Sequence, residues 1–310
     1  MPFILYFVLR YQVIGFKTSF AGELLNNPFL QSTNEQKYAT VLYTLVKYAQ
    51  LLLFPVTLTH DYYPYHVPLY GFDQFLPWAS LVLHLTLLVL VALNYKRHQW
   101  AALGLLMYLL PLLLVSNVLV NIGTFMNERF IYFSSVGFVM LAGIILHKLW
   151  HKNLIFRNLI HLFMVVVVLG FTYKTIDRNQ AWKNDETLFL TDIETSVNSA
   201  KANTTAGGTL LNMAGRGENT EANLEKAIYY LRRSLSIHPN YREPKLLLGN
   251  AYWQKHNVDS VIYFYNSILR NQPGYQLVYD NVLFMVRETN DPGIKLSFLN
   301  LVYSYKPNRL

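Results

Sequence analysis

Long apolar runs alternate with short polar connectors along roughly the first 175 residues of the chain. Four of these runs reach the length of about 20 mainly apolar residues that a membrane-spanning helix requires. They are Leu76 to Asn94, Trp100 to Val120, Phe130 to Trp150 and Ile155 to Tyr173. The pattern predicts an all-α, polytopic transmembrane domain over residues 1–175.

Two segments nearer the N-terminus fit a membrane span less well. Ala39 to Leu58 is long enough, but it contains Lys47 and Pro55, so it could span, kink or lie partly in the membrane interface. Pro2 to Phe16 is short and is interrupted by Arg10, which is typical of the end of a helix. We expect five to six membrane segments, and a chain that begins several helices into a larger domain.

Proline recurs at a fixed interval in the polar part of the chain that follows Tyr173. Pro239, Pro273 and Pro307 are 34 residues apart, which is the period of the tetratricopeptide helix–turn–helix repeat. Each proline is expected to end the second helix of its repeat. We therefore predict a junction over residues 176–198 and a tetratricopeptide-repeat α-solenoid of about three repeats over residues 199–310, the last of them a degenerate cap.

The repeat pattern also predicts which side chains pack the helices together. Gly207 and Gly249 stand where two helices approach closely, and Ala227, Tyr252 and Tyr265 occupy core positions. The first repeat carries eight more residues between its equivalent positions than the second, which predicts an insertion in its turn. For Tyr252, Tyr265, Leu248 and Ala251 core packing is preferred over a ligand role, while the concave groove of such an array binds segments of other proteins.

Composition and charge agree with a membrane protein. The chain is 53% hydrophobic and 14% charged, and its net charge is +8. The positive charges occupy connectors such as Tyr95 to His98 and His147 to Arg157, and no basic stripe is predicted, which disfavours nucleic acid as a partner. Positive connectors face the cytoplasm, so the acidic loop Thr59 to Gln74 and the repeat domain are predicted on the non-cytoplasmic side, in a periplasm or an ER lumen.

Candidate chemistry lies at the predicted outer edge of the membrane domain. Asp61 directly follows an apolar segment, and Glu128 and Arg129 stand at the start of the Phe130 helix. A charge at a membrane boundary is usually solvated, but it can also hold a lipid phosphate, and for Arg129 both interpretations remain open. The chain contains no phosphate-binding loop, metal-ligand motif or nucleophile elbow, so neither a metal nor another cofactor is expected.

Several stretches form a combination that is more specific than any one of them. They are Asn27-Pro28, Leu51 to Pro55, Thr57 to Tyr62, Gly123-Thr124, Glu128 to Phe138, Arg178, Trp182 and Asp185 to Phe189. With this combination, the chain resembles the transmembrane and tetratricopeptide-repeat (TMTC) proteins over nearly its whole length.

This resemblance implies a multi-pass GT-C glycosyltransferase of the protein O-mannosyltransferase type. Such an enzyme moves a sugar, here mannose, from a polyprenyl-phosphate carrier to Ser or Thr of an acceptor protein on the non-cytoplasmic face. By this resemblance Arg129 would hold the carrier phosphate, and Asp61 and Glu128 are the candidate catalytic carboxylates. The class carries its catalytic acid in a first external loop that this chain is expected to lack. The alternative is a non-enzymatic, membrane-anchored repeat scaffold for protein–protein interaction.

Overall fold

A computed structural model of the chain describes residues 8–9, 11–12, 24, 27–62, 65–119 and 122–306. Every regular element within these residues is a helix, which confirms the predicted all-α class. The chain divides into two compact units, one formed by residues 1–55 and 62–163 and the other by residues 56–61 and 164–310. Pro307 and most of the predicted segment Pro2 to Phe16 lie outside the described residues.

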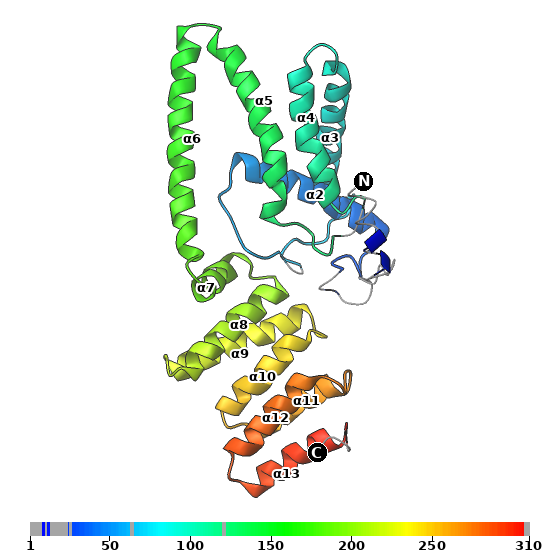
Figure 1. Cartoon of the computed structure of the whole chain (residues 1–310), viewed down its shortest axis with the longest axis vertical. Coiled ribbons are helices and arrows are strands. Elements are labelled where there is room, and N and C mark those ends of the chain that lie inside the picture. The colour runs from blue at the N-terminus through cyan, green and yellow to red at the C-terminus, as the bar shows by residue number, and fades with distance from the viewer. Residues whose placement is uncertain are drawn as a thin grey trace. The chain divides into compact units, whose positions relative to one another are not determined.

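The first unit is a group of apolar helices with one helix across them (Figure 1). Its elements are α2 (Asn34–Leu53), α3 (Phe75–Asn94), α4 (Gln99–Val115), the 3-10 helix η1 (Glu128–Ile131) and α5 (Tyr132–Trp150). A capping box of Thr33 and Gln36 begins α2, which ends before Pro55. Because α2 lies crosswise to α3, α4 and α5, it takes the arrangement that a helix in the membrane interface would have.

Three helical stretches are long and apolar enough to cross a membrane. They are α3, the continuous stretch Glu128–Trp150 and α6 (Leu154–Ala181). Of the 20 residues in α3, Pro77 and Ser80 are buried, whereas Val82, Leu85 and Val89 are among its exposed side chains. A helix with so much exposed apolar surface requires an apolar solvent, which indicates membrane association.

The remaining predicted span is shorter than the sequence suggested. The apolar run Trp100 to Val120 gives α4, which has 17 residues and ends at Val115. Within its first half, α4 packs closely on α5. A Cβ added to Gly137 would lie only 2.4 Å from the carbonyl oxygen of Gly104. Small residues at such a crossing allow two backbones to approach, which is how apolar helices associate in a membrane.

The second unit contains the end of α6, then α7 (Asp185–Thr195) and three consecutive helical hairpins. The hairpins are α8 (Ala200–Gly215) with α9 (Thr220–Ile237), α10 (Arg242–Gln254) with α11 (Val258–Leu269), and α12 (Gln276–Glu288) with α13 (Pro292–Tyr303). Pro239 and Pro273 lie in the turns after α9 and α11. The predicted insertion in the first turn was wrong, because the additional residues lengthen α8 and α9 and leave only residues 216–219 between them.

The two predicted glycines lie where helices of a hairpin meet. A Cβ on Gly249 would be 2.2 Å from Cε1 of Tyr265, and one on Gly207 would be 2.7 Å from Cγ of Leu231. Tyr265 and Ala227 are completely buried and Tyr252 is 9% exposed. The hydroxyl of Tyr265 donates to Oδ1 of Asn250 at 2.5 Å, so the ring is fixed at both ends.

Candidate functional site

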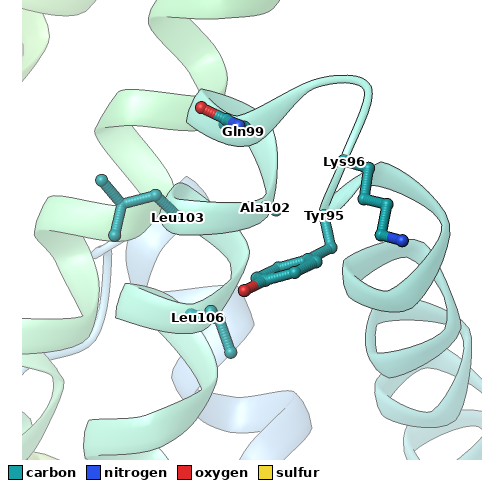
Figure 2. Close-up of a pocket in the computed structure, with 6 residues that line it drawn as sticks. All are labelled: Tyr95, Lys96, Gln99, Ala102, Leu103 and Leu106. Carbon is teal, nitrogen blue, oxygen red and sulfur yellow. The ribbon is translucent and has the colours of Figure 1, made fainter.

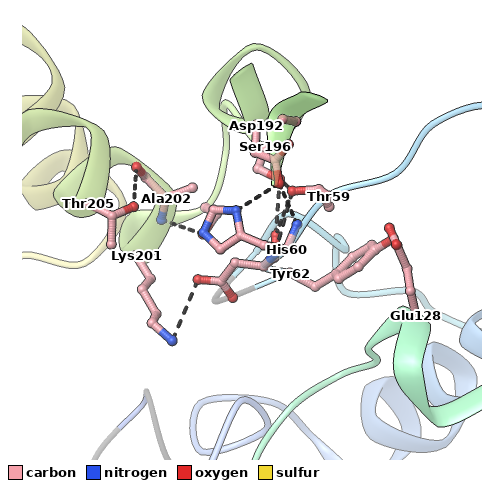
Figure 3. Close-up of polar contacts among 12 residues, drawn as sticks. Thr59, His60, Tyr62, Glu128, Asp192, Ser196, Lys201, Ala202 and Thr205 are labelled. Carbon is pink, nitrogen blue, oxygen red and sulfur yellow. Dashed lines mark hydrogen bonds and ion pairs between the residues drawn. The ribbon is translucent and has the colours of Figure 1, made fainter. Parts of the chain in front are cut away.

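The predicted residues Glu128 and Arg129 belong to a polar group in the first unit, which we call the Glu128 cluster: Tyr48, Tyr62, Asn127, Glu128 and Arg129. The hydroxyl of Tyr62 donates to Oε1 of Glu128 at 2.9 Å (Figure 3). The backbone N–H of Asn127 donates to the hydroxyl oxygen of Tyr48 at 3.1 Å. Both tyrosines are buried, so the start of η1 is held from two sides.

Arg129 differs from the other members of the Glu128 cluster in its exposure. Its backbone N–H is bound by the side chain of Asn127 at 3.2 Å, but its side chain is exposed. The guanidinium carbon lies 5.5 Å from the centre of the Phe130 ring, which is within the range of a cation–π interaction. An exposed guanidinium at the first turn of a bilayer-length helix can bind an anion from the membrane boundary.

A buried asparagine that the sequence analysis did not single out shapes the loop before the Glu128 cluster. Asn117 has a φ of 63°, in the left-handed region that asparagine tolerates better than most residues. Its Nδ2 donates to the carbonyls of Thr124 and Phe125 at 2.7 and 3.3 Å, and its Oδ1 accepts from the N–H of Ile122 at 2.9 Å. These bonds fold the chain back on itself and lead it to Asn127. A lone Asn closing an apolar run was the only available signal.

The second unit contains a separate polar network around Asp192 of α7, and the sequence analysis missed this residue too. Both guanidinium nitrogens of Arg178 donate to the Asp192 carboxylate, one of them at 2.8 Å. The N–H and Nδ1 of His60 lie 2.6 and 2.8 Å from Oδ2 of the same carboxylate (Figure 3). The Asp192 side chain is 1% exposed. A carboxylate with four donors around it anchors the segment 56–61 to the junction of α6 and α7.

The charge state of Asp192 follows from these contacts. Burial on its own would raise the pKa of this carboxyl. The hydrogen bonds from Arg178 and His60, together with the positive charge of Arg178, outweigh burial and hold the pKa of Asp192 well below its usual range. The carboxyl group is therefore ionised at physiological pH, as an acceptor of hydrogen bonds from both Arg178 and His60 requires.

Asp61, the other predicted carboxylate, lies in this junction network as well. The hydroxyls of Thr59 and Ser196 are 2.6 Å apart, and Ser196 donates to the carbonyl oxygen of Asp61 at 3.0 Å. The Asp61 carboxylate is 4% exposed and lies 3.9 Å from Nζ of Lys201 (Figure 3). By its contacts Asp61 belongs to the second unit, whereas Glu128 and Arg129 belong to the first. A buried, ion-paired carboxylate is suited to holding a loop in place.

A different opening lies in the first unit, at the turn that joins α3 to α4. It has a volume of about 520 Å³ and is lined by three polar and three apolar residues. They are Tyr95, Lys96, Gln99, Ala102, Leu103 and Leu106 (Figure 2). None of the carboxylates discussed above contributes to this cavity. Among the residues that the structure describes, no group of three or more His, Cys, Asp or Glu could hold a metal ion.

Comparison with known proteins finds relatives over most of the chain. Protein O-mannosyl-transferase TMTC3 of Mus musculus is 27% identical over 256 residues, covering 80% of this chain and 26% of the relative. Protein O-mannosyl-transferase TMTC1 of Homo sapiens is 28% identical over 221 residues, covering 69% of this chain and 24% of the relative. The chain is TMTC-like. Protein O-mannosyl-transferase Tmtc2 of Drosophila melanogaster is 31% identical over 146 residues, which are 47% of this chain and 15% of the relative.

These relatives confirm the family resemblance inferred from the sequence motifs. The TMTC-like chain spans about a quarter of the length of TMTC3 and TMTC1. No family model matches it, and no solved structure does.

Proposed function

We propose that this TMTC-like chain functions in a GT-C protein O-mannosyltransferase, to which it contributes membrane helices and helical repeats. In this proposal mannose moves from a polyprenyl-phosphate carrier to Ser or Thr of an acceptor protein. The observation that carries it is the similarity, over 80% of the chain, to a protein named a protein O-mannosyl-transferase. The geometry adds an exposed guanidinium at the start of an apolar, bilayer-length helix.

Arg129 is the residue we assign to the carrier phosphate. Sugar transfer releases a phosphate whose negative charge grows in the transition state, and a cation placed beside it lowers the barrier. Arg129 has the exposure for this role, and the hydrogen bond that its backbone N–H donates to Oδ1 of Asn127 fixes where its side chain begins. Glu128, held by Tyr62, is the carboxylate we assign to the same site. We assign Asp61 to loop positioning, because its carboxylate is buried beside Lys201.

The orientation of the membrane helices is part of the proposal. The connectors Tyr95 to His98 and His147 to Arg157 carry the positive charge, and in the first unit both lie at the end of the helices remote from η1 (Figure 1). Positive connectors stay in the cytoplasm, which supports a non-cytoplasmic position for Glu128 and Arg129. A glycosylation reporter fused after Leu310 tests whether the repeat domain is on the same side, and an unmodified reporter would overturn that assignment.

The helical hairpins of the second unit are proposed to be tetratricopeptide repeats that bind the acceptor protein. Leu277 and Phe284 are exposed on one face of α12, seven residues apart. Such a face suits a polypeptide ligand, because its exposed apolar side chains can contact apolar side chains of the ligand. The same observation supports the alternative of a non-enzymatic scaffold, in which the repeats bind a protein that is not modified.

The test uses the full chain in phosphatidylcholine liposomes with radiolabelled polyprenyl-phosphate mannose and a Ser/Thr-rich peptide. We expect the chain to bind both the carrier and the peptide, and carrier binding to be lost in Arg129→Ala. Arg97→Ala removes the same charge from the other end of the first unit and is expected to change neither. Carrier binding that is equal in Arg129→Ala and the unaltered chain would remove Arg129 from the mechanism. Repeats that capture the peptide without either carrier binding or transfer would replace the enzyme proposal with the scaffold.

A further inference from the structure

The cavity at the turn between α3 and α4 is lined by both polar and apolar residues. Its polar lining residues are Tyr95, Lys96 and Gln99, and its apolar ones are Ala102, Leu103 and Leu106. In Figure 2 the Tyr95 ring reaches from the turn toward α4, and Gln99 lies on the first turn of α4. The apolar residues follow one to two turns further along α4. A ligand that fits this cavity therefore has a polar end and an apolar end.

The two connectors at this end of the first unit carry positive charge. Lys96, Arg97 and His98 are consecutive, and the sequence contains no Asp or Glu between residues 74 and 127. The second basic connector, His147 to Arg157, lies at the same end of the first unit (Figure 1), and no Asp or Glu occurs between residues 129 and 176. With no nearby carboxylate from either connector to neutralise it, Lys96 favours an anionic ligand.

The length of α3 sets the depth of the cavity in a bilayer. Twenty residues at 1.5 Å each extend about 30 Å, which matches the hydrocarbon thickness. When α3 crosses a membrane, Tyr95 and Lys96 lie at the level of the lipid headgroups, and Leu103 and Leu106 lie beside the acyl chains. Tyr and Lys are the residues that favour this boundary.

We propose that this cavity binds one anionic phospholipid, which is a ligand beyond the proposed sugar-transfer function. Lys96 neutralises the phosphate, the amide of Gln99 donates a hydrogen bond to it, and an acyl chain lies along the Tyr95 ring, Leu103 and Leu106. The volume of about 520 Å³ accommodates a headgroup with the first part of a chain. The site is distinct from the Glu128 cluster, because it lies at the opposite end of the first unit.

The experiment measures lipid binding to the full chain by native mass spectrometry in detergent, titrating dioleoyl-phosphatidylglycerol against dioleoyl-phosphatidylcholine. Two variants change the cavity: Lys96→Gln removes its cation, and Leu103→Trp fills its apolar part. Two matched controls lie outside it: Lys152→Gln removes a cation from the other connector, and Leu110→Trp enlarges an exposed leucine of the same helix. Leu103 is 42% exposed, so the larger ring is tolerated by the fold.

We expect one phosphatidylglycerol to bind more tightly than phosphatidylcholine. Lys96→Gln should weaken the binding of phosphatidylglycerol about fivefold, which is the effect of one cation at a membrane surface. Leu103→Trp should weaken it by a similar factor with no change in charge, and the two controls should retain the affinity of the unaltered chain. Equal binding of the two lipids, or an equal loss in Lys152→Gln and Lys96→Gln, would overturn the proposal, because the effect would then come from general attraction.

Polyprenyl phosphate is a second lipid with an anionic phosphate headgroup. Its titration against the same variants distinguishes the two proposed sites. We expect Lys96→Gln to leave polyprenyl-phosphate binding unchanged, and Arg129→Ala to leave phosphatidylglycerol binding unchanged. If Lys96→Gln weakens polyprenyl phosphate as much as phosphatidylglycerol, the cavity holds the carrier and the phospholipid assignment is wrong. The failure of one proposal is thus visible independently of the other.

Discussion

The substitution Asp192→Asn tests the junction network of the second unit most directly. Asparagine has the same shape, but it is neutral and its amide nitrogen donates where the carboxylate oxygen accepts. In the native protein that carboxylate receives two bonds from Arg178 and lies within bonding distance of two nitrogens of His60. The variant therefore leaves a guanidinium that is 13% exposed without its counter-charge and places an N–H against other donors.

Removing one partner of a buried ion pair costs about 3–5 kcal/mol, and the 1% exposure of Asp192 places it in this class. For a unit of this size each kcal/mol lowers the melting temperature by roughly 2–4 °C, so we expect a decrease of about 6–20 °C. Thermal unfolding of the full chain, followed by circular dichroism, measures it. Hydrogen exchange of a peptide over residues 56–62 gives a second readout, because the N–H of His60 loses its acceptor and should exchange faster.

Asp177→Asn is the matched control for this prediction. Asp177 lies beside Arg178 in the same helix, but it is 55% exposed and pairs only with Lys174, at 3.5 Å. Exposed pairs contribute between zero and about 1 kcal/mol, so this variant should unfold almost as the unaltered chain does. If Asp192→Asn and Asp177→Asn have the same small effect, the junction network does not stabilise the second unit and our reasoning is wrong.

Three further predictions follow from groups described above. The pKa of Asp192 is lower in the folded state than in the unfolded state, so its stabilisation is complete above the unfolded pKa near 3.9 and is lost as the pH falls below that value. The free energy of unfolding, measured with urea at several pH values between 7 and 2, should therefore fall more with decreasing pH in the unaltered chain than in Asp192→Asn, and an equal fall in both would contradict this. Gly249→Ala should destabilise the repeats by about 1–2 kcal/mol, because overpacking against the fixed ring of Tyr265 outweighs the gain of about 1 kcal/mol in helix propensity. In the control Gly215→Ala the new Cβ meets its nearest neighbour at 3.6 Å, so this variant should not be destabilised. Equal unfolding midpoints of the two variants would contradict this prediction. Asn117→Ala should have a lower melting temperature than Asn117→Gly, by the equivalent of about 1 kcal/mol. Both variants lose the hydrogen bonds of the Asn117 side chain, but only alanine is also strained by the left-handed φ of 63°. The reverse order of melting temperatures would exclude a backbone contribution.

The apolar helices were predictable because their length is set by a solvent property. The run Leu76 to Asn94 became α3 with almost the same ends, and Phe130 to Trp150 became η1 with α5. Hydropathy could not predict where the end of a helix differs from the end of its apolar run. The helix α6 continues eight residues past the apolar run that ends at Tyr173, because its polar residues still favour helix, and α4 stops at Val115, before the left-handed Asn117.

The candidate sites were predictable only in part, for a physical reason that differs between them. Glu128 and Arg129 could be found because a charge beside a long apolar helix is costly and therefore conspicuous. Asp192 lies in an ordinary polar, amphipathic helix, where one more Asp carries no signal. Its partner His60 is 132 residues away in sequence, and no local periodicity reports a contact of that range.

The same separation of 132 residues has a consequence for how the protein is made. A ribosome adds about 5–20 residues per second, so the segment with Thr59, His60 and Asp61 emerges roughly 7–26 s before Asp192 exists. During that interval the four apolar helices α3 to α6 are synthesised, while the polar segment still lacks its partners from α7 and α8. Completion of the junction is thus a late step in biogenesis, and a nascent chain stopped within α6 would expose this segment to proteases and to quality-control chaperones.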